Sequence, residues 1–367
     1  MRVLVVSGIW PPDVGGPASH APEVAAFLLE ARHDPTVLVT ADRAPALEPY
    51  RVEWVSRSLP PGVRHVQALA AVRRLARQAD VVYSTGMFGR SGVGSLLARR
   101  PYVLKLTADP AFERARRRGL HDDSLAAFQT DRSLGTLPFR ASRDAIVRRA
   151  AHVVCPSSYL AELAVGWGVP AARVSVLPNP APEVDGLASR DELRGRFGFD
   201  GPTLVFGGRL TAQKSLGLAL EATAAAGVRL VVVGDGPERA RLEARGGADF
   251  LGPRPRREVL ELFRAADASL LSSSWENFPH GVVESLAVGT PVIATAVGGL
   301  AEVVSDGENG LLVPSGDAAA LTAAIRRYLD EPGLADRLRA NAAPSVERYS
   351  RTRVYARLLE LLTDAAR

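Results

Sequence analysis

The fold is decided by residues 203–236, TLVFGGRLTAQKSLGLALEATAAAGVRLVVVGDG. This stretch reads as an apolar strand, a glycine-rich turn, a helix near residues 215–226 and a second apolar strand. Continuous apolar runs are typical of parallel strands that are covered on both faces, and a helix between two of them makes a βαβ unit. The stretch therefore predicts an α/β domain with a parallel sheet.

The same alternation occurs on both sides of a proline-rich stretch, VSVLPNPAPEVDG at 174–186, which reads as a linker. The chain is also too long for one compact core. We therefore predict two βαβ domains with a ligand in the cleft between them. A helix is expected at 22–32 and a helical tail at about 318–364. The expected strands are VLVVS (3–7), TVLVT (36–40), DVVYST (80–85), YVLKLT (102–107), HVVCPS (152–157), TLVFGG (203–208), RLVVVGDG (229–236), ADFLG (248–252), ASLLSS (268–273), PVIAT (291–295) and GLLVP (310–314).

Composition favours a water-soluble protein of a reducing compartment. The chain of 367 residues is 47% hydrophobic and 23% charged, and a single cysteine, Cys155, excludes an internal disulfide framework. No apolar run approaches the ~18 residues of a spanning helix, and no signal peptide is recognisable.

Charge is distributed unevenly along the chain. Residues 1–178 hold 23 basic and 15 acidic residues, while residues 179–367 hold 22 and 25. The basic front half fits an anionic partner or an ordinary solvated surface. Of the 45 basic residues, all are arginine except Lys105 and Lys214, which points to positions where a compact ammonium is needed.

Two glycine-containing turns follow apolar strands. Gly15 and Gly16 in PPDVGG would let a ligand approach the backbone, although the turn lacks the full dinucleotide fingerprint and can be a plain turn. In GGRLTAQKS, Arg209 and Lys214 follow Gly208 and could bind a diphosphate, the alternative being a solvated loop.

The stretch SWENFPHGVVES at 274–285 holds two carboxylates, Glu276 in a turn and Glu284 in a short helix. Carboxylates accept hydrogen bonds from sugar hydroxyls, and backbone N–H groups of 277–280 are expected to be unpaired at the helix start. The alternative is that Glu276 merely complements the helix dipole.

A third strand end, YVLKLTADPAFERARRRG at 102–119, places Lys105 in an apolar strand and Asp109 just after it. A buried lysine is costly unless it is paired, so these two side chains either pair with each other or with neighbours, or they serve a site. A basic run follows, with Arg114 and residues 116–118.

GGRLTAQKS and ENFPHGVVESLAVGTPVIATAVGGLAEVV together resemble the signature of the retaining GT-B glycosyltransferases of family 4, also called glycosyl transferases group 1. PPDVGG, LPNP, GDGP and DGENGLLVP match the family in order. The resemblance implies two Rossmann-like domains facing across a cleft: an acceptor domain at 1–178, a donor domain at 179–345, and a C-terminal helix at 346–367 that returns to the first domain.

By position, the resemblance places Arg209 and Lys214 on the donor diphosphate, Glu276 on the transferred sugar and Glu284 on the ribose. Asp109 is the nearest polar candidate where many members carry a histidine, and it is expected to act in catalysis with Arg209, Lys214 and Glu276. The other expected donor-binding residues are Gly15, Gly16, Gly208, Gly252, Asn277, Phe278, Pro279 and His280, the last through its backbone.

The resemblance implies transfer of a hexose from a nucleotide-diphosphate sugar to an acceptor hydroxyl, with retention of configuration. No metal and no cofactor are expected, and UDP or GDP is the expected nucleotide. The acceptor is a small molecule, a glycan or a lipid-linked compound, nucleic acid is not expected as a partner, and the location is cytoplasmic, at the inner membrane surface if the basic half binds lipid. A sugar-nucleotide epimerase and an inactive nucleotide-binding subunit remain alternatives.

Overall fold

The computed structural model describes residues 1–13, 16–121 and 124–367, and the chain forms two compact units. Unit 1 comprises Met1–Pro178 together with Val354–Arg367, and unit 2 comprises Asn179–Arg353. The first break coincides with the expected linker. The return to unit 1 begins at Val354 rather than at the expected residue 346, because Val346 and Tyr349 are buried in the core of unit 2.

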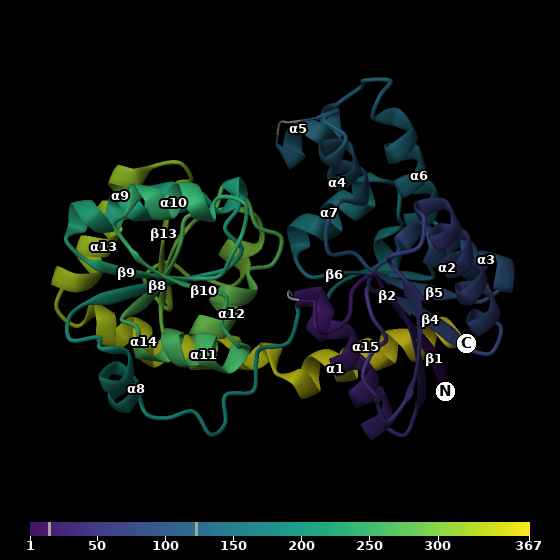
Figure 1. Cartoon of the computed structure of the whole chain (residues 1–367), viewed down its shortest axis with the longest axis horizontal. Coiled ribbons are helices and arrows are strands. Elements are labelled where there is room, and N and C mark those ends of the chain that lie inside the picture. Colours follow the sequence, from purple (N-terminus) through teal and green to yellow (C-terminus); the bar gives the residue numbers. More distant parts are fainter. Residues whose placement is uncertain (14–15, 122–123) are drawn as a thin grey trace. The chain divides into compact units, whose positions relative to one another are not determined.

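Unit 1 is built on a parallel sheet in the order β3-β2-β1-β4-β5-β6-β7 (Figure 1). Its elements are β1 (Arg2–Ser7), α1 (Gly16–Glu30), β2 (Asp34–Ala41), β3 (Arg51–Ser56), α2 (Pro61–Ala76), β4 (Val81–Ser84), α3 (Phe88–Ala98), β5 (Tyr102–Lys105), α4 (Pro110–Arg117), α5 (Leu125–Thr130), α6 (Leu137–Val147), β6 (His152–Cys155), α7 (Ser158–Gly166), η1 (Ala171–Arg173), β7 (Val174–Val176) and α15 (Arg351–Ala366).

The two faces of this sheet bury alternate residues of each strand, as the two-residue period of a strand requires. Leu4 and Val6 of β1 face helices α2, α6 and α7. Val3 and Val5 face α1 and α15, which lie on the same side of the sheet although they come from opposite ends of the chain (Figure 1). The hydroxyl of Tyr355 in α15 donates to Glu23 Oε2 in α1 at 2.8 Å.

Unit 2 repeats the architecture with the parallel order β10-β9-β8-β11-β12-β13. Its elements are α8 (Arg190–Phe197), β8 (Thr203–Gly207), η2 (Ala212–Lys214), α9 (Leu216–Ala226), β9 (Arg229–Val233), α10 (Arg239–Arg245), β10 (Asp249–Gly252), α11 (Arg256–Ala265), β11 (Ala268–Leu271), α12 (His280–Ala287), β12 (Val292–Thr295), η3 (Gly298–Glu302), β13 (Gly310–Val313), α13 (Ala318–Asp330), α14 (Leu334–Val346) and η4 (Glu347–Tyr349).

In unit 2 the helices again cover both faces of the sheet (Figure 1). Leu204 and Phe206 of β8 pack toward α9, α10 and α13, whereas Val205 packs toward α8 and α11. Both sheets thus follow the doubly wound pattern, in which the strand order reverses at a switch point. The switch point lies between β1 and β4 in unit 1 and between β8 and β11 in unit 2.

The expected strands are all present, but two details differ from the sequence prediction. Helix α1 begins at Gly16 rather than at Pro22, which lies inside the helix. Strand β3 was not predicted, because RVEWVS is an edge strand with a single fully buried position and therefore lacks a continuous apolar run.

Candidate functional site

The predicted donor residues of unit 2 gather at the switch point of its sheet. The loop after β8 carries Arg209 and Lys214, and the loop after β11 carries Glu276. Strands β8 and β11 are neighbours, so their carboxyl ends open side by side. The two loops are bonded to each other: Gln213 Nε2 donates to Trp275 O at 2.8 Å, and Ser272 Oγ donates to Lys214 O at 3.0 Å.

Lys214 and Glu276 form an ion pair between Nζ and Oε1. The Glu276 side chain is 7% exposed and that of Lys214 is 19% exposed, so the pair sits in a partly desolvated site. Ser273 Oγ also donates to Glu276 Oε1, at 2.6 Å. A carboxylate held on one oxygen by two donors keeps lone pairs on its second oxygen for a hydroxyl group.

The backbone of Glu276 is held by a glycine pair that follows β12. Gly299 N donates to Glu276 O at 3.1 Å. Gly298 has φ +51°, and a Cβ on it would lie 1.9 Å from Glu276 O. No residue with a side chain fits at this position without moving the loop, so the glycine fixes where the carboxylate stands.

Arg209 is exposed at the end of β8 and makes no side-chain hydrogen bond or ion pair with any of the described residues. Most arginines in unit 2 are bound to carboxylates or carbonyl oxygens, for example Arg194 to Asp267. An exposed guanidinium beside an ion pair leaves its donors available for an anionic ligand.

Glu284 lies in α12, whose other face packs into the core through Val282, Val283 and Leu286, as the sequence predicted. Its Oε1 is 3.2 Å from Arg256 Nε at the start of α11, and its side chain is 19% exposed. The carboxylate therefore sits at the surface of the same end of the sheet, oriented by an arginine that the sequence analysis did not include.

The loop before α12 corrects one expectation. Pro279 has no N–H, and His280 N donates to Phe278 O at 3.1 Å, so neither residue supplies the unpaired N–H group that we predicted. His280 instead has a side-chain contact, since its Nε2 lies 2.9 Å from Asn179 Nδ2 in the linker. Phe278 and Pro279 are buried, and Asn277 is partly buried beside them.

Glycines also allow the neighbouring loops to approach one another. Gly234 follows β9 and has no room for a side chain. A Cβ added to it would lie 1.9 Å from the carbonyl oxygen of Gly208. Gly252 ends β10 with φ +73° and accepts a hydrogen bond from Gly234 N at 2.9 Å. Gly208 and Gly252 thus lie in the group of contacting loops that also carries Arg209.

In unit 1, the structure describes only one of the two glycines that were predicted to contact the donor. Gly15 lies outside the described residues, and Gly16 is the first residue of α1, after the loop that follows β1. Gly16 therefore falls at the switch point of the first sheet.

Asp109 has a structural role in place of the expected catalytic one. It caps α4, where its Oδ1 accepts from the backbone N–H groups of Ala111 and Phe112. Its Oδ2 accepts from Arg143 Nη1 at 2.6 Å and from Gln129 Nε2 at 3.1 Å. The side chain is fully buried, so both oxygens are occupied and closed to solvent.

Lys105 does not pair with Asp109. Its Nζ donates to Leu177 O at 3.0 Å, and the residue is buried within the sheet beside Cys155. Burial lowers the pKa of Lys105 to about 7, and burial raises the pKa of the Cys155 thiol to about 12. A lysine buried in the interior of a sheet can lose its proton, whereas an arginine there stays charged.

Among residues 1–13, 16–121 and 124–367, no group of three or more His, Cys, Asp and Glu side chains is arranged to hold a metal ion. Over the same ranges, no helix has both the length and the apolar character needed to cross a bilayer.

Sequence comparison finds similarity along nearly the whole chain. The model of "Glycosyl transferases group 1" matches residues 189–344, and that of "Glycosyl transferase 4-like domain" matches residues 15–180. A "GDP-mannose-dependent alpha-mannosyltransferase" of Mycobacterium tuberculosis is 31% identical over 342 residues, with 86% of this chain and 85% of that protein covered. A "Glycogen synthase" of the same species is 29% identical over 381 residues, with 94% of this chain and 89% of that protein covered.

Among solved structures, the Anabaena protein HepE in complex with UDP-glucose superposes with a TM-score of 0.77 at 20% identity, covering 99% of this chain and 100% of that one. Identity at this level shows the fold alone, and that fold is GT-B.

Proposed function

Because the chain belongs to the family of glycosyl transferases group 1, we propose that it transfers a hexosyl group from a nucleoside-diphosphate sugar to an acceptor hydroxyl with retention of configuration. The observation that carries the proposal is the meeting of Arg209, Lys214 and Glu276 at the switch point of the unit 2 sheet. Two cations and one carboxylate at such a place suit a diphosphate and a polyhydroxylated ring.

Each group has a part in the proposed reaction. Arg209 and Lys214 bind the diphosphate and stabilise the charge that develops on the leaving oxygen, so no metal ion is required. Glu276 accepts hydrogen bonds from hydroxyls of the sugar, and Glu284 accepts from the ribose. The side chain of Ser273 keeps the Glu276 carboxylate oriented at 2.6 Å.

The chemical step balances without a protein base. The acceptor oxygen attacks the anomeric carbon from the face that the diphosphate leaves, and the bond from that carbon to the phosphate oxygen breaks. The electron pair departs with the phosphate oxygen, which then takes the proton of the acceptor hydroxyl. The loss of Asp109 as a catalytic residue is compatible with this route, because its carboxylate is not needed for proton transfer.

Two alternatives predict different products. A sugar-nucleotide epimerase would convert the donor in the absence of any acceptor, and an inactive subunit would bind nucleotide without turnover. The anomeric configuration of the product, measured by NMR through the coupling of the anomeric proton, tests retention directly. An inverted product would overturn the proposed route.

The donor nucleotide is expected to stabilise the fold. A ligand that binds the native state raises the free energy of unfolding by about 2.7 kcal/mol at 100 times its Kd. We expect UDP or GDP to raise the Tm by several degrees in a panel that also contains ADP and dTDP, measured by differential scanning fluorimetry. The bases are suggested by the UDP-glucose complex of HepE and by the GDP-mannose-dependent relative.

The same panel on Lys214→Ala is the control. The shift should be lost there, and a shift of unchanged size would mean that the nucleotide binds elsewhere. A wild-type chain that responds to none of the four nucleotides would contradict the proposal.

We further propose that unit 1 contacts an anionic membrane surface from the cytoplasmic side. Leu120, Leu134 and Leu137 are 45%, 83% and 55% exposed, and they follow the basic residues 114 and 116–118 in the sequence. Apolar side chains flanked by arginines are typical of surfaces that bind anionic lipids.

The full chain is expected to sediment with vesicles that contain phosphatidylglycerol at low salt, and less of it should sediment at 0.5 M NaCl. Leu134→Ser should reduce the bound fraction, whereas Leu47→Ser, another exposed leucine in unit 1, should not. Absence of the wild-type chain from the pellet at low salt would remove this part of the proposal.

A further inference from the structure

Three arginines belong to the helices that begin at one edge of the unit 1 sheet. Arg64 lies in α2, Arg90 in α3 and Arg114 in α4. These helices follow β3, β4 and β5, and because the strands are parallel, all three helices begin at the carboxyl edge of the sheet. Arg114 belongs to a basic run in the sequence, whereas Arg64 and Arg90 lie in other segments.

None of the three arginines has an acidic partner among the described residues. Arg64 Nη1 donates to the carbonyl of Arg57 at 3.0 Å, and Arg90 Nη1 lies 3.0 Å from His65 Nδ1. Arg143, in contrast, is paired with Asp109 at 2.6 Å. The cluster therefore carries three positive charges that no described carboxylate compensates.

The charges of this cluster act on one another. Burial lowers the pKa of Arg90, and the charges of Arg64 and Arg114 lower it further. Burial also lowers the pKa of His65, with Arg90, Arg64 and Arg114 as the next causes. Like charges held together in this way repel, and a bound anion would relieve the repulsion.

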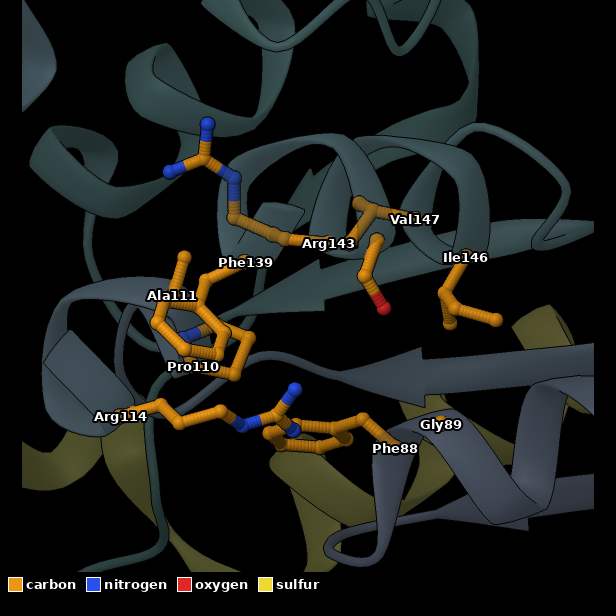
Figure 2. Close-up of a pocket in the computed structure, with 10 residues that line it drawn as sticks. Phe88, Gly89, Pro110, Ala111, Arg114, Phe139, Arg143, Ile146 and Val147 are labelled. Atoms are coloured by element: carbon orange, nitrogen blue, oxygen red, sulfur yellow. The ribbon is translucent and has the colours of Figure 1, made fainter. Parts of the chain in front are cut away.

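A pocket lies directly beside the cluster (Figure 2). Phe88, Pro110, Ile146 and Phe139 contribute apolar surface from α3, α4 and α6. In Figure 2 the side chain of Arg114 extends from α4 toward Phe88, and the guanidinium of Arg143 points away from both. The pocket is thus apolar, with one uncompensated guanidinium at its side.

We propose that unit 1 binds a phosphate monoester on the acceptor, with its phosphoryl group between Arg64, Arg90 and Arg114 and its adjoining apolar portion against the open mouth of the small pocket beside Phe88 and Phe139. This inference rests on the proposed function and names the acceptor class of the same enzyme. Three guanidinium groups suit a phosphate dianion better than a carboxylate, because each offers a planar pair of donors to a group with three acceptor oxygens.

Phenyl phosphate and phenol are a matched pair of probes for this site, since they differ by the phosphoryl group alone. Isothermal titration of the full chain, with the donor site of unit 2 saturated by the nucleotide that binds there, is expected to detect phenyl phosphate and not phenol. Equal binding of both probes would overturn the proposal. Loss of phenyl phosphate binding in Lys214→Ala but not in Arg114→Gln would overturn it too, because the phosphate would then sit in unit 2.

Single substitutions locate the bound phosphate. Arg64→Gln and Arg114→Gln should each weaken phenyl phosphate binding by about tenfold, as expected for a lost charge-assisted contact. Arg73→Gln removes the same charge from an exposed position later in α2 and should leave binding within about twofold of wild type. Equal effects of Arg64→Gln and Arg73→Gln would mean that net charge alone is responsible.

His65 provides a local signal that does not depend on turnover. Phenyl phosphate should raise the pKa of His65, measured by NMR of its ring protons, because a bound dianion offsets the three arginines. Arg114→Gln should raise that pKa even without ligand. An unchanged His65 pKa on saturation with phenyl phosphate would place the phosphate elsewhere.

The phosphate could belong to a free molecule or to a lipid headgroup. Competition of phenyl phosphate with vesicles of phosphatidic acid in phosphatidylcholine, but not with phosphatidylcholine alone, would assign the site to a lipid-borne phosphate. Lack of competition would assign it to a water-soluble acceptor. Failure of the nucleotide panel together with intact phenyl phosphate binding would refute the donor assignment while leaving this site in place.

Discussion

Lys214→Ala is expected to lower kcat by about 10³-fold, which corresponds to ~4 kcal/mol of transition-state stabilisation from one preorganised cation. The assay measures release of the nucleoside diphosphate from the donor that the thermal panel identifies. Lys214 lies where the proposed mechanism needs a positive charge close to the leaving phosphate oxygen, and its ammonium is held by Glu276. Because Lys214 also binds the diphosphate before the reaction, the loss should appear both in kcat and as a higher KM for the donor.

The control for this variant is Arg241→Ala, which removes a cation from an exposed site in α10 of the same unit, where its partner is Glu238. Its turnover should stay within about twofold of wild type, since surface ion pairs contribute little. Circular dichroism of both variants checks that the fold is intact. A Lys214→Ala enzyme that is folded and retains wild-type kcat would contradict the assignment of the donor site.

The ion pair also predicts a strong coupling between two substitutions. Glu276→Gln keeps the size of the side chain but removes the charge that holds Lys214, so it should reduce turnover as well. Because each residue positions the other, the double variant is expected to lose much less than the product of the two single losses. Multiplicative losses would indicate that the two groups act independently.

Lys105→Met is expected to make unit 1 more stable than the wild type at pH 7. The difference in the free energy of unfolding between variant and wild type should become smaller by about 2 kcal/mol at pH 8.5. The ammonium of Lys105 is buried, and its pKa falls to about 7, while an unfolded lysine titrates near 10.4. Between these values the unfolded chain binds more protons than the folded one. Stability of the wild type therefore rises with pH in this window, by about 1.4 kcal/mol per pH unit.

The pH range in which stability rises with the titration of Lys105 is limited at its upper end by Cys155. Burial raises the pKa of Cys155 to about 12, so at high pH the unfolded thiol loses its proton first and the stability contribution of Cys155 falls. Urea unfolding followed by tryptophan fluorescence from pH 7 to 8.5 avoids most of this opposing effect. Identical pH slopes for wild type and Lys105→Met would contradict a titrating Lys105.

Lys105→Arg is the contrasting control for the same position. A guanidinium does not deprotonate near neutral pH, so it would remain charged in the space between Leu177 and Cys155. We expect Lys105→Arg to be less stable than wild type throughout the window. This would explain why a chain with two lysines among its 45 basic residues places one of them here.

The two lysines separate what could be predicted from what could not. Their scarcity marked both positions in the sequence, and the location of Lys214 in a turn after a strand indicated an anion site. For Lys105 and Asp109 the sequence left open whether they pair with each other, pair with neighbours or serve a site. The structure bonds Lys105 to Leu177 and Asp109 to Arg143, which lie 72 and 34 residues away in sequence.

Other supporting contacts were also beyond the reach of sequence reasoning. Ser273, Gly298 and Asn179 hold the loop of Glu276 and the start of α12, yet nothing in their local sequence specifies those partners. The Gly298–Gly299 pair after a strand was a signal that could have indicated a close backbone approach. The edge strand Arg51–Ser56 was missed because an exposed strand does not need an apolar face.

The sequence by itself determined two parallel α/β sheets, the linker near Pro178 and the strand ends that carry Arg209, Lys214, Glu276 and Glu284. It could do so because buried parallel strands impose continuous apolar runs, and because the residues that follow them lie at one edge of a sheet. The tertiary structure alone decided which side chains meet there. It joined Lys214 to Glu276 and enclosed Asp109 in a buried ion pair with Arg143. It also placed Arg114 of α4 in the lining of a pocket that α3 and α6 complete. Such contacts depend on packing between segments that are distant along the chain.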